Sequence, residues 1–158
     1  MAKVKRSQIA TFVNSTPSSS TPTYKLLGVG VTTGKVNMNP KTTEETYIHE
    51  DTATITVDSY APTQPVEMTI ESTNDVFTFI DGLYANRSVL SDAETYIVEV
   101  DYYKSSAASA WPARKQKVSI QIDDKGGDGG QPAKINFTMN HQGAAVAGSF
   151  NPVSASFA

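Results

Sequence analysis

The chain has no cysteine, which excludes disulfide bridges and thiolate metal sites throughout its 158 residues. No run approaches the roughly 18 to 20 apolar residues that a membrane helix needs. The N-terminus lacks the apolar segment of a secretory signal, so we expect folding in a cytoplasm and no contact with a membrane. Stability must then come from packing or from oligomerisation.

Charge is scarce, because only 18% of the residues are charged and the formal net charge is −3. With 39% hydrophobic residues, the composition is that of one soluble globular domain over residues 1–158. A net negative chain is a poor electrostatic match to a phosphate backbone, although short basic clusters lie at residues 3–6 and 114–117. The second cluster is predicted to protect a solvated edge strand.

Motifs for catalysis or metal binding are missing. Neither His49 nor His141 has the spaced partners of a zinc site or a nucleophile–base pair. Asp123, Asp124 and Asp128 surround a glycine-rich turn, but they lack the alternating ligands and closing glutamate of a calcium loop. We therefore predict no enzyme, no metal site and no cofactor.

Alternating apolar and polar residues predict a chain made mainly of strands. In residues 53–60, Ile55 and Val57 alternate with polar neighbours, as in a sheet that is wet on one face. Pro62 and Pro65 cannot donate ladder hydrogen bonds, so we expect them to bracket a turn that pairs residues 53–60 with residues 66–71. The predicted strands cover residues 24–31, 47–50, 53–60, 66–71, 95–104, 115–124, 133–139 and 144–150.

One helix is predicted at residues 75–87, where the apolar period changes to about 3.6 residues. Thr73 or Asn74 can cap its free amide groups, and Asp75 lies near the positive end of the helix dipole. The predicted fold is mainly β, of the α+β class: a β-sandwich or barrel-like unit of about seven or eight strands with one flanking helix.

Three polar segments are expected outside this core. Residues 36–46 are too polar and turn-prone to continue a strand, so they are expected to form a long loop that leaves the sheet. Residues 1–23, with a Ser/Thr/Pro run at 14–23, are expected to form a flexible arm, and residues 151–158 a tail. Each is either solvated or ordered by a neighbouring chain.

The order of these segments carries a resemblance. G-V-G-V-T-T-G-K at 28–35 ends a strand, M-N-P-K-T-T-E-E-T-Y-I follows at 38–48, Y-A-P-T makes a turn at 60–63, and N-D-V-F-T-F-I-D-G-L begins a helix at 74–83. Over residues 24–104 the chain resembles the major tail tube proteins of long-tailed (siphovirus-type) bacteriophages. The remainder matches in layout only.

The resemblance implies a structural virion protein whose six copies form a ring, with rings stacking into a tube for genome delivery. It implies assembly in the cytoplasm of a host bacterium, other copies of the chain, tape measure, tip and terminator proteins as partners, and genomic DNA that passes without specific binding. A contractile tail shares these features. The long loop would reach the adjacent ring through Asn37, Met38, Asn39, Pro40, Lys41, Thr42, Thr43, Glu44 and Glu45, and the lumen-facing candidates are Glu67 and Glu71.

A different class of function stays open at this point. Tyr102, Tyr103 and Trp111 could form a stacking platform on a monomeric β-sandwich that binds carbohydrate or a surface. A tube subunit forms rings or filaments as its concentration rises, whereas a binding module stays monomeric.

Overall fold

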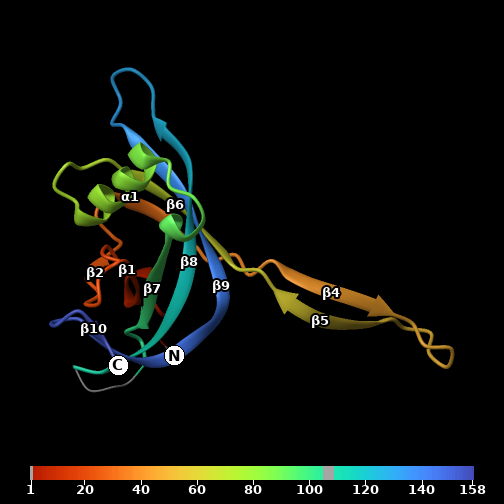
Figure 1. The fold of residues 1–158 in the computed structure, drawn as a ribbon. Helices are drawn as coiled ribbons and strands as arrows, with labels where there is room; N and C mark the ends of the chain where they lie inside the picture. Colours follow the sequence, from red (N-terminus) through yellow and green to blue (C-terminus); the bar gives the residue numbers. More distant parts are fainter. Residues whose placement is uncertain (1, 105–108) are drawn as a thin grey trace.

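The computed structural model describes residues 2–104 and 109–158, which fold around one curled sheet (Figure 1). The main sheet has the strand order β2-β1-β7-β8-β9-β6-β3, with β10 on β9, while β4 and β5 pair only with each other. The strands are β1 (Ile9–Asn14), β2 (Tyr24–Leu26), β3 (Val31–Gly34), β4 (Pro40–Glu45), β5 (Thr54–Tyr60), β6 (Thr63–Thr69), β7 (Glu94–Asp101), β8 (Trp111–Gly126), β9 (Lys134–Asn151) and β10 (Ser156–Phe157).

The predicted mainly β fold with one flanking α-helix is confirmed. Ten strands are present in the described residues instead of seven or eight, since the chain makes short strands in segments read as polar loop and tail. Two 3₁₀ helices, Arg6–Gln8 and Leu90–Ala93, precede β1 and β7. The residues 133–139 and 144–150, predicted as two strands, form the single long strand β9.

The sheet carries a small core on each of its faces. Adjacent residues of a strand point to opposite faces, and the neighbours Phe12 and Val13 of β1 belong to different clusters of buried side chains. The larger cluster contains Val13, Val66, Met68, Val76, Ile80, Ile97, Val118, Ile120, Ile135, Phe137 and Met139. The smaller one contains Phe12, Tyr24, Val98, Val100, Ala113 and Phe150.

The α-helix α1 (Asp75–Asn86) covers the larger cluster, as its apolar period predicted. Asn74 is the N-cap, because its side-chain oxygen accepts hydrogen bonds from the amides of Val76 and Phe77. Ile80 is completely buried, and burying such a side chain is worth about 1.5 to 3 kcal/mol, more than the cap contributes. Packing on the sheet therefore holds the helix.

The expected pairing of residues 53–60 with residues 66–71 is wrong. β5 pairs with β4, while β6 lies between β3 and β9. Pro65 does not bracket a turn but lies inside β6, just beyond the last pair that β6 makes with β3, at Val66. Its missing N–H is tolerated there because β3 no longer runs alongside. Residues 47–50, predicted as a strand, lie at the turn between β4 and β5.

The expected N-terminal arm is partly built into the sheet. β1 pairs with both β2 and β7, and its residues 11–14 are buried, with Val13 only 1% exposed. The side-chain oxygen of Asn14 accepts hydrogen bonds from the amides of Thr16 and Thr23, which closes the Ser/Thr/Pro loop. A buried polar side chain thus orders a segment that has almost nothing to bury itself.

Candidate assembly surfaces

The hairpin of β4 and β5 projects away from the body as an isolated ribbon (Figure 1). Every residue of both strands is exposed. At its root, Asn37 exchanges backbone hydrogen bonds with Thr63, and the Asn39 side chain donates to the Ala61 carbonyl. A two-stranded hairpin without a core is marginally stable in water at best. The ribbon therefore has the character of a segment that gains its support from another molecule.

The two faces of the ribbon differ in polarity. Ile55 and Val57 lie opposite Glu44 and Thr42 on one face, with exposed fractions of 65% and 50%. Thr43 and Asp58 are hydrogen-bonded to each other on the other face. At the tip, the Ile48 side chain is fully exposed. Exposed large aliphatic side chains gathered on one small element indicate a contact surface.

The main sheet is open, and its two edge strands are β2 and β3. Both strands are short, three and four residues, as is common for edges that must not pair indiscriminately. Neither strand has a second strand beside it in the described residues, although the Gly34 carbonyl of β3 accepts a hydrogen bond from Arg6. An edge of this kind can take a strand from another chain, and heterologous contacts close into rings when the rotation allows.

A polar face covers the sheet on the side away from α1. Glu67 on β6 forms an ion pair of 2.5 Å with Lys134 of β9. The Asp123 carboxylate accepts hydrogen bonds from Gln121 and Thr138, and Asp124 accepts one from Asn136. These contacts spread a hydrogen-bonded polar layer over β6, β8 and β9, and they engage two of the three carboxylates considered as calcium ligands, Asp123 and Asp124.

Comparison with known proteins adds one finding. No family model and no curated protein matches this sequence. By structure, the chain is similar to a chain from the "tail of empty GTA particle", refined with helical and C6 symmetry. The TM-score is 0.61 at 11% sequence identity, covering 91% of this chain and 98% of that chain. At this identity the match shows that the chain shares its fold with that tail chain.

Within this tail-subunit fold, the structure separates the predicted site residues. Asn37 and Asn39 clamp the ribbon root, Met38 lies beside them, and the candidates from Pro40 to Glu45 form β4. Glu67 points to the polar face, whereas Glu71 lies beyond β6 in the turn before α1. The predicted loop and lumen residues are therefore on two separate surfaces, and Glu71 does not share the strand of Glu67.

The second basic cluster is not on an edge, because β8 runs between β7 and β9. Arg114 forms ion pairs with Glu99 and Asp101, and Lys117 forms one of 2.8 Å with Glu94. This hydrogen bond to Lys117 lowers the pKa of Glu94. Alternation places Arg114 and Lys117 on opposite faces of the strand, so the cluster forms no basic patch.

The three aromatic residues do not form the stacking platform that the sequence analysis considered. Tyr102 and Trp111 meet edge to face at 5.3 Å and pack against the smaller core cluster. Burial raises the pKa of the Tyr102 hydroxyl. The rings of Tyr102 and Trp111 are half-buried against this cluster, and only Tyr103 of the three is exposed.

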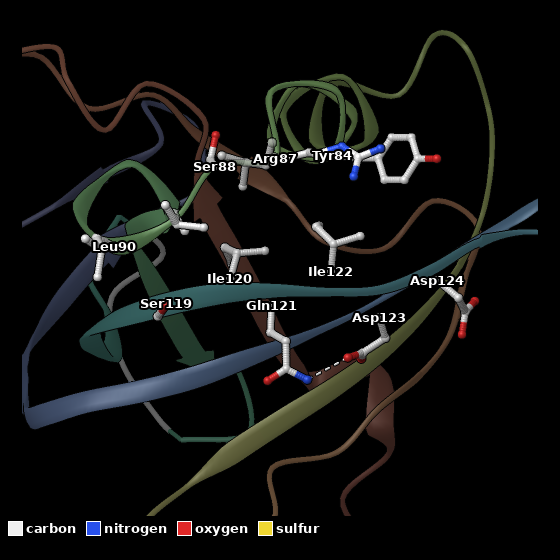
Figure 2. Close-up of a pocket in the computed structure, with 13 residues that line it drawn as sticks. Tyr84, Arg87, Ser88, Leu90, Ser119, Ile120, Gln121, Ile122, Asp123 and Asp124 are labelled. Carbon is white, nitrogen blue, oxygen red and sulfur yellow. Dashed lines mark hydrogen bonds between the residues drawn. The ribbon is translucent and has the colours of Figure 1, made fainter.

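A hollow lies between the end of α1 and β8 (Figure 2). Ile120 and Ile122 point from β8 toward Tyr84 and Arg87, while Gln121 and Asp123 point to the other side of the strand. Val89 and Leu90 at its rim are 66% and 84% exposed, and Leu90 has a φ of 54°. A leucine in the left-handed region is uncommon, and sequence periodicity carries no signal for it.

A second pocket lies at the ribbon root, lined by Val36, Met38, Tyr60 and by His141 of β9. The His141 Nε2 is buried without a hydrogen-bond partner in the described part of the chain. Burial lowers the pKa of His141 below its ordinary value. Neutral imidazole is therefore the form that this position favours.

The described residues contain no group of three or more histidine and acidic side chains placed to hold a metal ion. None of the helices in the described ranges is long and apolar enough to cross a membrane.

Proposed function

We propose that this chain is a tail tube protein, a structural component of a virion that assembles into stacked hexameric rings and forms the conduit for genome delivery. The observation that carries the proposal is the fold: nearly the whole chain superposes on a subunit of a tail with C6 symmetry. Self-association is the function that this arrangement serves, and the proposed place of action is the virion tail, after assembly in the cytoplasm of a bacterial host.

The surfaces of the chain support the proposal. Open edges at β2 and β3 suit strand-to-strand contacts around a ring, in which closure uses up both edges. The ribbon suits contacts between rings, because its strands are exposed on both faces and Ile48 at its tip is fully exposed. Ordering on a neighbour carries an entropy cost, which keeps free subunits soluble until a nucleus forms.

The polar face is the proposed lining of the tube. Glu67 is neutralised by Lys134, so the negative potential there comes from Asp123 and Asp124, which have no cationic partner among the described residues. A negative lining repels phosphate groups and lets DNA slide without specific binding. The tape measure protein would occupy the same lumen, and tip and terminator proteins would meet the tube ends.

The experiment that tests the proposal is negative-stain electron microscopy of the purified protein across a concentration series, paired with light scattering. We expect hollow rings and tubes that lengthen as concentration rises. A protein that stays monomeric at every concentration would overturn the proposed function.

A further inference from the structure

The charge of this chain is divided unevenly between ribbon and body. Residues 40–60 hold five of the sixteen acidic residues and one of the thirteen basic residues, which gives a net charge of −4. The other residues hold eleven acidic and twelve basic residues, a net charge of +1. The negative charge of the whole chain thus resides on an element that has no core of its own.

At the tip of the ribbon, the acidic side chains are free to meet a partner. The side chains of Glu44 and Asp51 make no ion pair or hydrogen bond within the described residues. Glu45 contacts only the hydroxyl of Tyr47, at 3.0 Å, and Glu50 only His49, at 3.4 Å. We name Glu44, Glu45, Glu50 and Asp51 the acidic tip.

Four exposed cations lie in two segments that meet near the root of the ribbon: Lys3, Lys5 and Arg6 before β1, and Lys35 between β3 and β4. Arg6 donates one hydrogen bond to the Gly34 carbonyl at 2.9 Å, which brings the N-terminal segment beside Lys35. Lys3, Lys5, Arg6 and Lys35, named here the basic collar, form no ion pair in the part of the chain that the structure describes.

Most other cations of the body have a partner, and the exception among the described residues is Arg87, the C-cap of α1, which forms no ion pair. Six of them have a carboxylate partner: Lys25, Lys104, Arg114, Lys117, Lys125 and Lys134. Lys115 lies over the ring of Tyr96, 4.6 Å from its centroid. The collar is therefore a local excess of uncompensated positive charge.

The acidic tip cannot neutralise the collar of its own chain. The six residues of β4 alone extend about 20 Å at roughly 3.3 Å per residue, whereas an ion pair needs its atoms within about 4 Å. The ribbon also points away from the body (Figure 1). Complementary charges at opposite ends of one projecting element can meet only between two copies.

We propose that the acidic tip of one copy docks on the basic collar of a second copy in the next ring. The contact is heterologous, since each copy offers its tip to one neighbour and its collar to another, so it repeats along the direction of the ribbons. Six such contacts per ring act together, which makes weak individual pairs sufficient. This inference rests on the proposed function and adds the surface that receives the ribbon.

Charge reversal tests the inference. Glu44→Lys with Asp51→Lys reverses the tip, and Lys5→Glu with Lys35→Glu reverses the collar. All four side chains are exposed, so we expect unfolding temperatures that match the unmodified protein. Each double variant should raise the concentration needed for tube formation at least tenfold, measured by light scattering and electron microscopy at low salt.

Combining the two charge reversals should restore assembly. The chain that carries all four substitutions, and an equimolar mixture of the two double variants, should form tubes again, because each reversed tip then finds a reversed collar. Asp92→Lys with Asp128→Lys is the charge-matched control, since both side chains are exposed and lie outside the ribbon. It should leave assembly unchanged.

The outcomes separate the two proposals. Tubes formed by both double variants at the concentration that the unmodified protein needs would overturn the docking contact and leave the tail tube function standing. An unmodified protein that never assembles would overturn both. If Lys5→Glu with Lys35→Glu abolished binding to duplex DNA but left tubes unchanged, the collar would be a nucleic-acid site and the docking contact would be wrong.

Discussion

The ring of Phe157 lies directly against Gly148, and this contact fastens the C-terminal segment to the sheet. A Cβ atom at position 148 would come within 2.6 Å of the Phe157 ring and 2.4 Å of the Ala158 carbonyl oxygen. Ser149 and Ala158 exchange two backbone hydrogen bonds of 2.9 and 2.8 Å beside it. The segment expected as a tail is thus partly a strand, β10, whose Phe157 packs on the smaller core.

Gly148→Ala should release this segment, because overpacking a close contact costs typically 1 to 3 kcal/mol. We expect faster hydrogen exchange at the Ser149 and Ala158 amides and a lower unfolding temperature. Gly129→Ala is the matched control, since nothing lies within 4 Å of its added Cβ. Unchanged exchange at Ser149 in Gly148→Ala would show that β10 tolerates the extra methyl group.

Asn74 links α1 to the sheet in two ways, and two substitutions separate them. Its oxygen caps the helix, and its Nδ2 donates to the Val29 carbonyl at 3.0 Å. Asn74→Ala removes both contacts and should cost about 1 to 2 kcal/mol of unfolding free energy. Asn74→Asp keeps the cap acceptor, so its cost in urea unfolding should be clearly smaller. Equal losses in the two variants would mean that the bond to Val29 dominates.

His141 predicts how stability depends on pH. Burial lowers its pKa in the folded chain below the ordinary value of 6.5, so the unfolded chain binds the proton more readily. The stability contributed by the neutral ring is present above pH 6.5 and is lost as the pH falls below it. The pKa of Glu94 is lowered from 4.5 by its hydrogen bond with Lys117, so its contribution to stability is present above pH 4.5 and is lost only as the pH falls below that value.

Thermal unfolding between pH 7.5 and 5 checks this. The unmodified protein should lose stability below about pH 6.5, and His141→Gln should show a flatter profile over this range. His49→Gln is the control, because that side chain is 75% exposed on the ribbon. A His141→Gln profile as steep as that of the unmodified protein would assign the acid sensitivity to other groups.

The helix and the four strands β6, β7, β8 and β9 of the main sheet could be predicted because their signals are local. The 3.6-residue period around Ile80 and the cap at Asn74 need no knowledge of the rest of the chain. Pairing is not local: β1 lies next to β7, more than 80 residues later, and the period of a strand does not reveal its neighbour. For this reason the alternation in residues 53–60 predicts a strand but does not show that its partner is β4 and not β6.

The composition of residues 40–45 does not indicate the first strand of the ribbon. Residues 40–45 are polar and exposed on both faces, so they show no alternation, and alternation is the signal of a half-buried strand. The available clue was the β-branched pair Thr42 and Thr43, which favours extended backbone. The arm was misassigned for a similar reason, because Phe12 and Val13 form only a short apolar run beside the Ser/Thr/Pro loop.

Removing the ribbon should separate folding from assembly. A chain in which Asn-Gly replaces residues 41–59 joins the paired residues Pro40 and Tyr60 by a two-residue hairpin turn. The deleted strands bury nothing in either core, so the free energy of unfolding should change by less than about 1 kcal/mol. Circular dichroism should report the same fold, while electron microscopy shows no stacked tubes. We expect stacking to need the ribbon, because no other described segment of the chain projects so far from the body (Figure 1). Full-length tubes from the shortened chain would exclude the ribbon as the contact between rings.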